Sequence, residues 1–319
     1  MALQLGSIQQ ASFPDAWLTI GTYDGVHIGH QEIIRGLAAG ARAEGVPAVV
    51  LTFHPHPAAV VRQLGGPHLL SMPAERADYL SEAGADVIIT QPFDHQVAGT
   101  DAEDFLALLK KNLGFRHLWV GYDFALGHKR SGDIHRLHEI GERLDYQLKV
   151  IPAVHLHGQI VSSSRIRGML REGLVSQAAE ALGRWYKIQG EVVKGDGRGH
   201  TLGFPTANLS VPAEKFIPQS GVYACIARWN GCERPAAVNI GLRPTFDDSF
   251  AVTQIEAHIL DFQGDLYGQQ LSLSFIGRLR DEKGFPSIHA LIEQVQQDIA
   301  QTRSLVGMHI PAGQAELNS

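Results

Sequence analysis

Two histidines near the N-terminus stand at a spacing that suits phosphate binding. His27 and His30 end the glycine-punctuated segment Gly21–His30, where Gly25 and Gly29 let the main chain approach a ligand closely. Apolar residues follow at helical spacing, so the pair lies at the expected start of a helix. Imidazole and backbone N–H groups there can donate hydrogen bonds to phosphate oxygens. For a lone histidine we would favour capping of the helix or packing in the core, but the pair among glycines favours a phosphate site.

A second run of anion-binding side chains occurs further along the chain. Ser162–Arg167 offers three serine hydroxyls and two guanidinium groups just before another helical pattern. Hydroxyls and backbone N–H groups can surround a polyphosphate, and arginine binds phosphate through two parallel hydrogen bonds. The alternative is a serine N-cap followed by arginines in solvent. Because the run follows the histidine pair in the same half of the chain, we favour phosphate binding.

A glycine-rich stretch marks the second half. Gly195–Asn208 contains four glycines beside charged residues, which suits a flexible flap over an anion. Thr206 and Asn208 at its end supply hard oxygen ligands, of the kind that helps Mg²⁺ bind a nucleotide's phosphates. This stretch could also be only a turn.

One carboxylate interrupts an apolar strand pattern. Glu256 and His258 share one face of the predicted strand Thr253–Leu260, whose other face is apolar. A carboxylate in that setting could accept a proton from a substrate hydroxyl. The solvent-facing side of an edge strand would give the same pattern, and the sequence leaves both readings open.

Alternating strands and helices must position the first two motifs. Five apolar strands separated by helical patterns predict an α/β doubly wound parallel sheet; they are Trp17–Ile20, Ala48–Phe53, Val87–Thr90, Leu118–Val120 and Leu148–Ile151. Ligands collect at the carboxyl ends of such strands. Asp123 follows one of these strands and could bind a ligand. The histidines of the turn His54–Pro57 follow another. We read that turn as shaping a ligand pocket rather than as a metal site, since no third ligand accompanies it.

Near residue 185 the pattern changes to short strands with turns, which predicts an antiparallel barrel or sandwich. The predicted strands are Lys187–Val193, Val222–Trp229, Pro235–Ile240, Thr253–Leu260 and Leu271–Phe275. A terminal helix should cover the barrel with the stripe Ile288, Leu291, Ile292, Val295 and Ile299. We therefore expect domains at 1–184 and 185–306, and a loosely ordered tail at 307–319.

The composition of the chain argues against some classes of function, such as nucleic-acid binding and membrane insertion. The chain has 319 residues, 44% hydrophobic and 19% charged, which suits two globular domains. A net charge of −6 offers no broad basic surface for nucleic acid. No leader or bilayer-spanning run is recognisable, so we expect a cytoplasmic protein with no membrane partner. Asn230-Gly231 predicts a tight hairpin that keeps Cys225 and Cys232 apart and reduced.

The motifs together resemble known families. His27-Ile-Gly-His30 after a first strand is similar to the His-x-Gly-His motif of the nucleotidyltransferase superfamily. In order and spacing, the whole set resembles the prokaryotic bifunctional riboflavin kinase/FAD synthetase family. The segments that carry this resemblance are Gly21–His30, Thr52–Pro57, Gly121–Gly132, Ser162–Arg167, Gly195–Asn208, Asn239–Phe246, Glu256–Phe262 and Leu279–Phe285.

The resemblance implies two activities on one chain. A nucleotidyltransferase, Rossmann-like domain would adenylylate FMN to FAD, and a β-barrel domain with a C-terminal helix would phosphorylate riboflavin to FMN. ATP would be the co-substrate of both steps, with Mg²⁺ as cofactor, FMN and FAD as products, and no nucleic-acid partner; a homo-oligomer stays open. The implied catalytic residues are His27, His30 and Glu256; the ATP-binding residues Gly21, Asp24, Gly25, Gly29, Ser163, Ser164, Arg165, Gly195 and Gly203; the flavin-binding residues Asp123, Phe124 and Arg280; and the metal ligands Thr206 and Asn208.

The sequence departs from the family in a few places. Thr22 stands where the family commonly has Asn, Ala125-Leu126 replaces a more usual Arg-Phe pair, and Ser164 replaces Thr. Lys194 and His200 stand where His and Arg are frequent. Two alternatives follow: a riboflavin kinase with a degenerate N-terminal domain, or a flavin-binding regulator without turnover. A pantetheine- or nicotinate-type adenylyltransferase would leave residues 185–305 unexplained.

Overall fold

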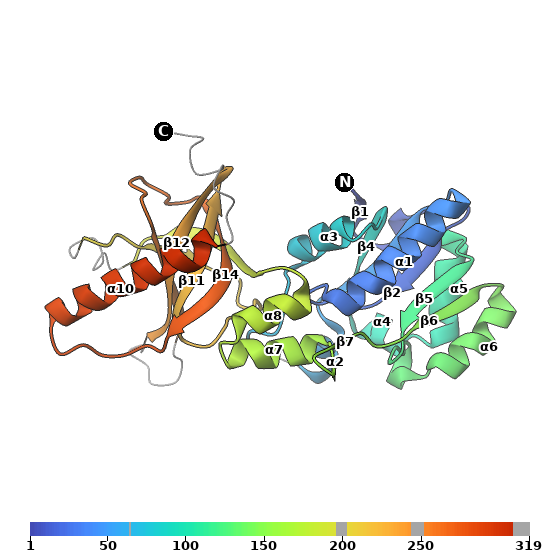
Figure 1. Ribbon diagram of the computed structural model, residues 1–319. Coiled ribbons are helices and arrows are strands. Elements are labelled where there is room, and N and C mark those ends of the chain that lie inside the picture. Colours follow the sequence, from blue (N-terminus) through green and yellow to red (C-terminus); the bar gives the residue numbers. More distant parts are fainter. Residues whose placement is uncertain (64, 196–202, 244–251, 309–319) are drawn as a thin grey trace. The chain divides into compact units, whose positions relative to one another are not determined.

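The chain folds into two compact units, Met1–Ser163 and Ser164–Ser319. The computed structural model describes residues 1–63, 65–195, 203–243 and 252–308 (Figure 1). The predicted tail therefore lies largely outside the described residues, as do parts of the Gly195–Asn208 and Asn239–Phe246 segments. In the described ranges, no helix is both long and apolar enough to cross a lipid bilayer.

A parallel sheet forms the centre of the first unit, as the alternating pattern predicted. In its described residues the sheet has six strands in the order β1-β4-β3-β2-β5-β6, and every neighbouring pair is parallel. The strands are β1 (Leu3–Leu5), β2 (Trp17–Ile20), β3 (Ala48–His54), β4 (Val87–Pro92), β5 (His117–Gly121) and β6 (Gln147–Ile151). The sequence pattern missed only β1, which has three residues at the sheet edge.

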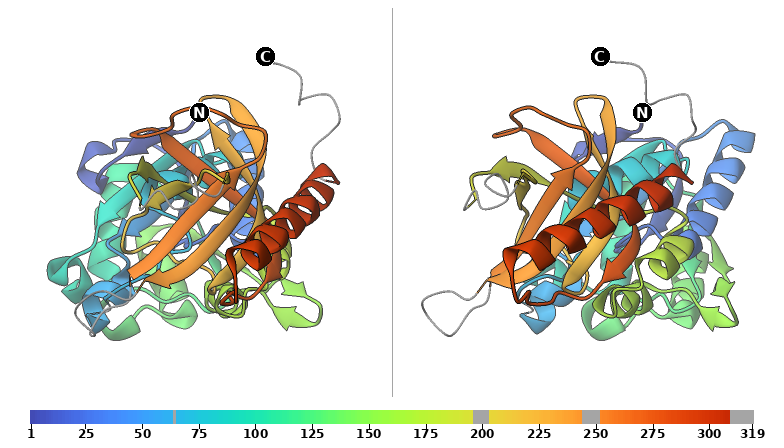
Figure 2. Two further views of the ribbon diagram at one scale, coloured as in Figure 1. Left: turned by 90° about the vertical axis from the view of Figure 1, so that its left-hand side faces the viewer. Right: turned by 60° about the vertical axis from the view of Figure 1, so that its left-hand side comes forward.

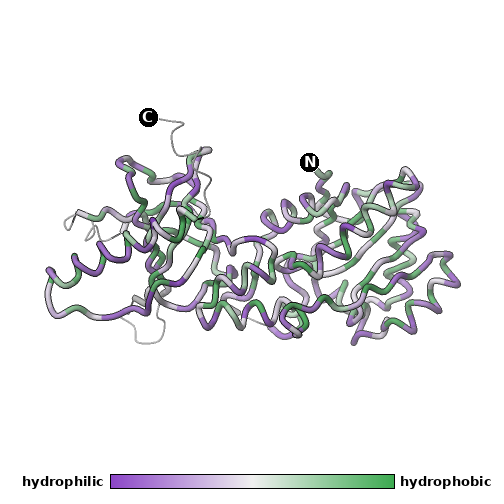
Figure 3. Tube along the Cα trace, in the orientation of Figure 1, coloured by the Kyte–Doolittle hydropathy of each residue, from purple (hydrophilic) through white to green (hydrophobic). Residues whose placement is uncertain are grey.

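Helices cover both faces of this sheet, because each carries one apolar stripe. Residues of α1 (Ile28–Glu44) and α3 (Pro73–Glu82) pack on one face, and those of α5 (Ala102–Leu113) and α6 (Ile134–Leu144) on the other. Along these helices, hydrophilic and hydrophobic stretches alternate in Figure 3. The shorter elements are η1 (Ile8–Gln10), α2 (Pro57–Arg62), α4 (His95–Gly99), η2 (His128–Arg130), β7 (His155–Leu156) and β8 (Gln159–Ile160).

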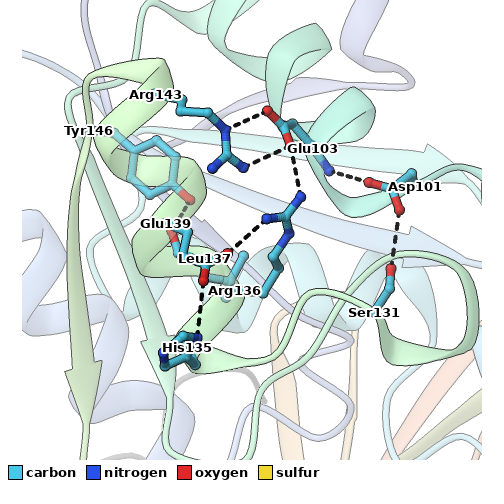
Figure 4. Close-up of polar contacts among 9 residues, drawn as sticks. All are labelled: Asp101, Glu103, Ser131, His135, Arg136, Leu137, Glu139, Arg143 and Tyr146. Atoms are coloured by element: carbon cyan, nitrogen blue, oxygen red, sulfur yellow. Dashed lines mark hydrogen bonds and ion pairs between the residues drawn. The ribbon is translucent and has the colours of Figure 1, made fainter.

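An ion-pair cluster joins α5 to α6. Glu103 accepts hydrogen bonds from Arg143 Nε and Nη2 at 2.8 Å each and from Arg136 Nη2 at 3.1 Å (Figure 4). The Arg143 hydrogen bonds, followed by the charges of Arg143 and Arg136, hold the pKa of Glu103 below its ordinary value. Nearby, the Ser131 hydroxyl donates to Asp101. The cluster fastens the segment between β5 and α6 to the start of α5.

A closed antiparallel barrel forms the centre of the second unit. Within the described residues its strand order is β10-β13-β12-β11-β14-β9. The strands are β9 (Tyr186–Val193), β10 (Ala207–Ser210), β11 (Gly221–Trp229), β12 (Cys232–Arg243), β13 (Val252–Ile259) and β14 (Gln270–Arg280), preceded by α7 (Ser163–Arg171) and α8 (Val175–Leu182). The sequence pattern missed β10. The predicted hairpin is confirmed: Cys225 pairs with Ala236 and Cys232 with Trp229.

The terminal helix α10 (Ile288–Gly307) packs on the outside of the barrel (Figure 2), and four residues of its predicted stripe are half-buried: Leu291, Ile292, Val295 and Ile299. Its buried residues are Asp298, Thr302 and Val306, whereas Ile288 is 66% exposed. Val306 packs with apolar residues of β11 and β14. The helix therefore presents a partly polar face to the barrel, which apolar periodicity does not reveal.

Candidate active sites

His27 and His30 lie together at the start of α1. His27 is the N-cap residue, and its Nδ1 accepts a hydrogen bond from the His30 backbone N–H at 3.3 Å. The two rings stack with centroids 3.6 Å apart and an interplanar angle of 18°. Because Nδ1 of His27 is an acceptor, its neutral ring carries the proton on Nε2, which is then a donor. The pair thus combines imidazole donors with a helix N-terminus.

The histidine loop, residues 21–27, has a strained backbone. Tyr23 and Val26 have φ values of 47° and 39°, which side chains with a Cβ rarely adopt, and Val26 is β-branched. The Tyr23 hydroxyl bonds to Thr19 Oγ1, and burial raises the pKa of Tyr23 well above its ordinary value, so the phenol stays protonated. Its ring lies edge-on to His30, with centroids 5.0 Å apart.

Hydrogen bonds from distant segments hold the loop. The buried carboxylate of Asp24 accepts from the backbone N–H groups of Leu70 and Ser71, both at 3.1 Å. Gly25 N–H donates to the Ser71 hydroxyl at 2.9 Å. The Ser163 hydroxyl donates to the Asp24 carbonyl at 2.9 Å, so two of the predicted phosphate-binding segments meet. Asp24 is only 1% exposed and its carboxylate anchors the loop, and its predicted ATP-binding role stays a prediction.

The two other predicted glycines of this site make close backbone contacts. The N–H of Gly21 donates to the Leu51 carbonyl at 3.0 Å, and an added Cβ would lie 2.9 Å from the Tyr23 ring. At Gly29 an added Cβ would lie 3.3 Å from the His27 ring. Both positions therefore favour glycine next to an aromatic ring.

Arg76 in α3 is a residue of this site that the sequence analysis missed. Its side chain is 1% exposed, and Nη1 donates to Thr22 O at 2.6 Å, Phe53 O at 3.2 Å and Thr52 Oγ1 at 3.3 Å. Burial lowers the pKa of Arg76, and the charge of Asp24 offsets part of that effect. No local pattern marks this residue, because all three acceptors are far away in sequence.

The other residues predicted to bind ATP or flavin with the histidine pair have mixed placements. Asp123 is exposed just beyond β5, and its backbone carbonyl accepts from Arg130 Nη2 at 2.9 Å. Phe124 packs against the hydrophobic core. In α7, Ser164 is exposed and Arg165 half-buried. The predicted ligand roles of these four residues stay predictions.

In the barrel, Asn208 and Glu256 lie directly opposite each other on β10 and β13. Gln254 Nε2 donates to Asn208 Oδ1 at 2.7 Å and to Glu256 Oε1 at 2.8 Å. Asn239 on β12 is the other cross-strand neighbour of Glu256. Ile255 and Ala257 are buried, so the alternation predicted around Glu256 is present. Gln254 was missed, although it stands two residues before Glu256 on the same strand face.

The glycine-rich segment meets this cluster at its first residue. An added Cβ at Gly195 would lie 2.1 Å from Asn208 Nδ2. Gly203 has φ +83°, and among the described residues no atom beyond its chain neighbours lies within 4 Å of an added Cβ. Thr206 is half-buried directly before β10. Residues 196–202 between these points lie outside the described residues.

Arg280, predicted to bind flavin, contacts α10 in the structure. Its Nε and Nη2 donate to the buried Asp298 carboxylate at 2.8 to 3.1 Å, and Nη1 donates to the Asp281 carbonyl at 2.9 Å. The guanidinium thus stabilises the helix–barrel contact. A flavin-binding role for Arg280 stays a prediction.

The oxygen atoms near Glu256 suit a hard cation shared with a substrate. Asn208 and Thr206 offer one amide and one hydroxyl oxygen, and Mg²⁺ commonly takes few protein ligands together with substrate phosphates. Within the described ranges, no group of three or more His, Cys, Asp or Glu side chains could hold a metal by itself. The donors therefore fit a magnesium ion that arrives with a nucleotide.

Comparisons with known proteins cover both units. A family described as FAD synthetase matches residues 9–165, and one described as riboflavin kinase matches residues 182–306. The bifunctional riboflavin kinase/FMN adenylyltransferase of Escherichia coli strain K12 is 34% identical over 309 residues, 96% of this chain and 97% of the relative. Its namesake from Pseudomonas fluorescens is 35% identical over 288 residues, 90% of this chain and 92% of the relative.

A solved structure shares the whole fold. The crystal structure of a Streptococcus pneumoniae protein titled a macrolide-efflux protein has a TM-score of 0.85 and 28% identity, and the match covers 95% of this chain and 98% of that chain. The relatives above exceed 30% identity over nearly the full length of both partners. The chain belongs to the bifunctional riboflavin kinase/FMN adenylyltransferase family.

Proposed function

We propose that this chain phosphorylates riboflavin to FMN in its barrel domain and adenylylates FMN to FAD in its parallel-sheet domain, using ATP in both steps. The observation that carries the proposal is that each unit holds its own cluster of the expected type. One unit has the stacked pair His27 and His30 at a helix N-terminus, and the other has Glu256 opposite Asn208. We place the domain boundary near residue 185, just before β9.

For the kinase step, Glu256 is the general base. Its carboxylate accepts the proton of the ribityl 5′-hydroxyl while that oxygen attacks the γ-phosphorus of ATP, and ADP leaves. Asn208 and Thr206 would hold Mg²⁺, which neutralises charge on the phosphates. Gln254 orients both Asn208 and Glu256 through its two N–H donors.

For the adenylyl transfer, an FMN phosphate oxygen attacks the α-phosphorus of ATP and pyrophosphate leaves. His27 and His30 donate hydrogen bonds to the oxygens on which negative charge develops, and the helix dipole adds to this stabilisation. Ser163, Ser164 and Arg165 bind the phosphates, and Asp123 helps to seat the flavin. Positioning and charge neutralisation account for most of the catalysis in such transfers.

The setting of the enzyme is part of the proposal. We place it in the cytoplasm, where ATP is available. Riboflavin, FMN and ATP are its small-molecule partners, and neither nucleic acid nor a membrane takes part.

The test is to incubate the pure full-length protein with riboflavin, ATP and Mg²⁺ and to separate the flavins by chromatography. We expect FMN first and FAD later. FMN alone would support a kinase with a degenerate first domain, an outcome that the departure at Ala125-Leu126 makes worth testing. If neither FMN nor FAD forms, the result contradicts the proposal and favours a flavin-binding regulator.

A further inference from the structure

The proposed chemistry does not use Arg76, although this arginine is one of the most buried residues of the first unit. One nitrogen, Nη1, contacts the carbonyl of Thr22 after β2 and that of Phe53 near the end of β3, at 2.6 and 3.2 Å. The carboxyl ends of these neighbouring strands are where ligands collect in such sheets. Arg76 therefore joins the first part of the histidine loop to the next strand.

The loop needs to be held from outside, because its own backbone is strained. Tyr23 and Val26 sit at positive φ, a conformation that persists only when surrounding contacts impose it. Asp24 fastens the middle of the loop through Leu70 and Ser71. The carbonyl of Thr22, at its start, accepts from Arg76 and from the Thr52 hydroxyl, the latter at 3.0 Å. Those two donors define where the loop leaves the sheet.

Burying the charged side chain of Arg76 in the core lowers the stability of the fold. Its Nε and Nη2 atoms have no hydrogen-bond partner among the described residues, and burying such donors is unfavourable. Burial also lowers the pKa of Arg76, which shows that its charged form loses hydration. An apolar side chain of similar size often stabilises a core as well as a buried charge does. Residues that cost stability in this way are expected near functional sites.

We propose that Arg76 is a positioning residue for adenylyl transfer: by holding the Thr22 carbonyl it fixes the loop that places His27 and His30. It does not touch the reacting atoms. The inference rests on the proposed function of the first domain, and it adds a residue outside the motifs that carry the family resemblance. A long side chain that ends in a donor group is required, because Nη1 alone reaches the Thr22 carbonyl beyond β2 and the Phe53 carbonyl on β3.

The test compares full-length Arg76→Met and Arg76→Lys with Arg42→Met, an exposed arginine of α1 that serves as the matched control. FAD formation from FMN, ATP and Mg²⁺ gives kcat and KM, while FMN formation from riboflavin reports on the other domain of the same molecule. We expect Arg76→Met to lower kcat for FAD about 100-fold, since small misplacements of catalytic groups cost that much. Arg76→Lys keeps the charge and one contact, so its kcat should stay within about tenfold of wild type. FMN formation should not change in any variant.

Two further measurements separate positioning from mere stability. Melting temperatures show whether each variant is folded, and the imidazole proton resonances of His27 and His30 should shift in Arg76→Met but not in Arg42→Met. If Arg76→Met does not fold, Thr52→Val decides, because it removes the other hydrogen bond to the Thr22 carbonyl. A loss of about fivefold in kcat for FAD would then support the proposal, and an unchanged kcat would overturn it.

A folded Arg76→Met protein with the kcat of Arg42→Met would overturn the inference, as would Arg76→Lys performing no better than Arg76→Met. These outcomes differ from a failure of the proposed function, in which the wild-type protein itself makes no FAD.

Discussion

Asn208 and Glu256 face each other across β10 and β13, and the amide of Gln254 donates one hydrogen bond to each of them. The proposed metal ligand and the proposed base are therefore neighbours although 48 positions separate them in the chain, the difference between 256 and 208. This register places a carboxylate beside an amide oxygen on one face of the barrel wall. This arrangement suits the proposed base acting next to a magnesium-bound phosphate.

Replacing Gln254 should impair the kinase step. In Gln254→Leu both hydrogen bonds disappear, and a hydrogen bond to a charged group is worth about 1.5–3 kcal/mol, so we expect kcat for FMN formation to fall about tenfold or more. Gln189→Leu changes an exposed glutamine on β9 and is the control. Equal rates for the two variants would show that Gln254 does not orient the pair.

A methyl group at Gly195 should disturb the same cluster. An added Cβ would lie 2.1 Å from Asn208 Nδ2, and Asn208 is buried, so its side chain has to move. We expect Gly195→Ala to lower kcat for FMN formation about tenfold and to leave FAD formation from supplied FMN unchanged. Gly307→Ala is the control, because among the described residues nothing outside its own helix lies within 4 Å of the added Cβ there. A kinase rate like that of the control would contradict the predicted role of Gly195.

The contact between α10 and the barrel depends on a buried ion pair. Asp298 is 3% exposed and accepts from both Arg280 Nε and Nη2. Removing one partner of such a pair costs about 3–5 kcal/mol, so Asp298→Ala should lower the unfolding free energy of the barrel domain by about that amount in denaturant titrations. Asp261→Ala removes an exposed aspartate paired with Arg303 and should cost less than about 1 kcal/mol. If both variants lost the same unfolding free energy, the ion pair between Arg280 and Asp298 would not stabilise the barrel domain more than the exposed pair does.

Acid should weaken the contact between α5 and α6. The pKa of Glu103 lies below its ordinary value of 4.5, chiefly because of hydrogen bonds from Arg143. The ionised carboxylate therefore stabilises the fold above pH 4.5, and this contribution is lost as the pH falls through the lowered pKa. Glu103→Gln should be less stable than wild type at pH 7, and the difference should shrink in acid. Glu82→Gln, an exposed residue of α3, is the control for thermal unfolding at each pH. A difference that does not change with pH would contradict this account.

Local patterns were enough to predict much of the fold. Trp17–Ile20 was predicted with its observed bounds, and the hairpin register of Cys225 followed from Asn230-Gly231. The closeness of His27 and His30 was equally predictable, because residues three apart on a helix are neighbours. These features depend only on periodicity and turn chemistry within a short window.

Features set by distant partners could not be read from the sequence. Apolar periodicity could not predict that α10 buries Asp298, because the partner of this carboxylate is Arg280 on β14. Arg76 was missed for the same reason, since its acceptors lie on β3 and beyond β2. The strand β10 has four residues directly after Pro205 and Thr206, too short a run for an alternating pattern to stand out.

If two separate active sites share this chain, each should work when the other is disabled, and a mixing experiment shows whether they do. His30→Ala should convert riboflavin to FMN but make no FAD, and Glu256→Gln should make FAD from FMN but no FMN from riboflavin. An equimolar mixture of the two variants with riboflavin, ATP and Mg²⁺ should accumulate FAD, because FMN released by one variant can be used by the other. FAD formed by His30→Ala alone, or FMN formed by Glu256→Gln alone, would show that these residues do not serve two separate sites.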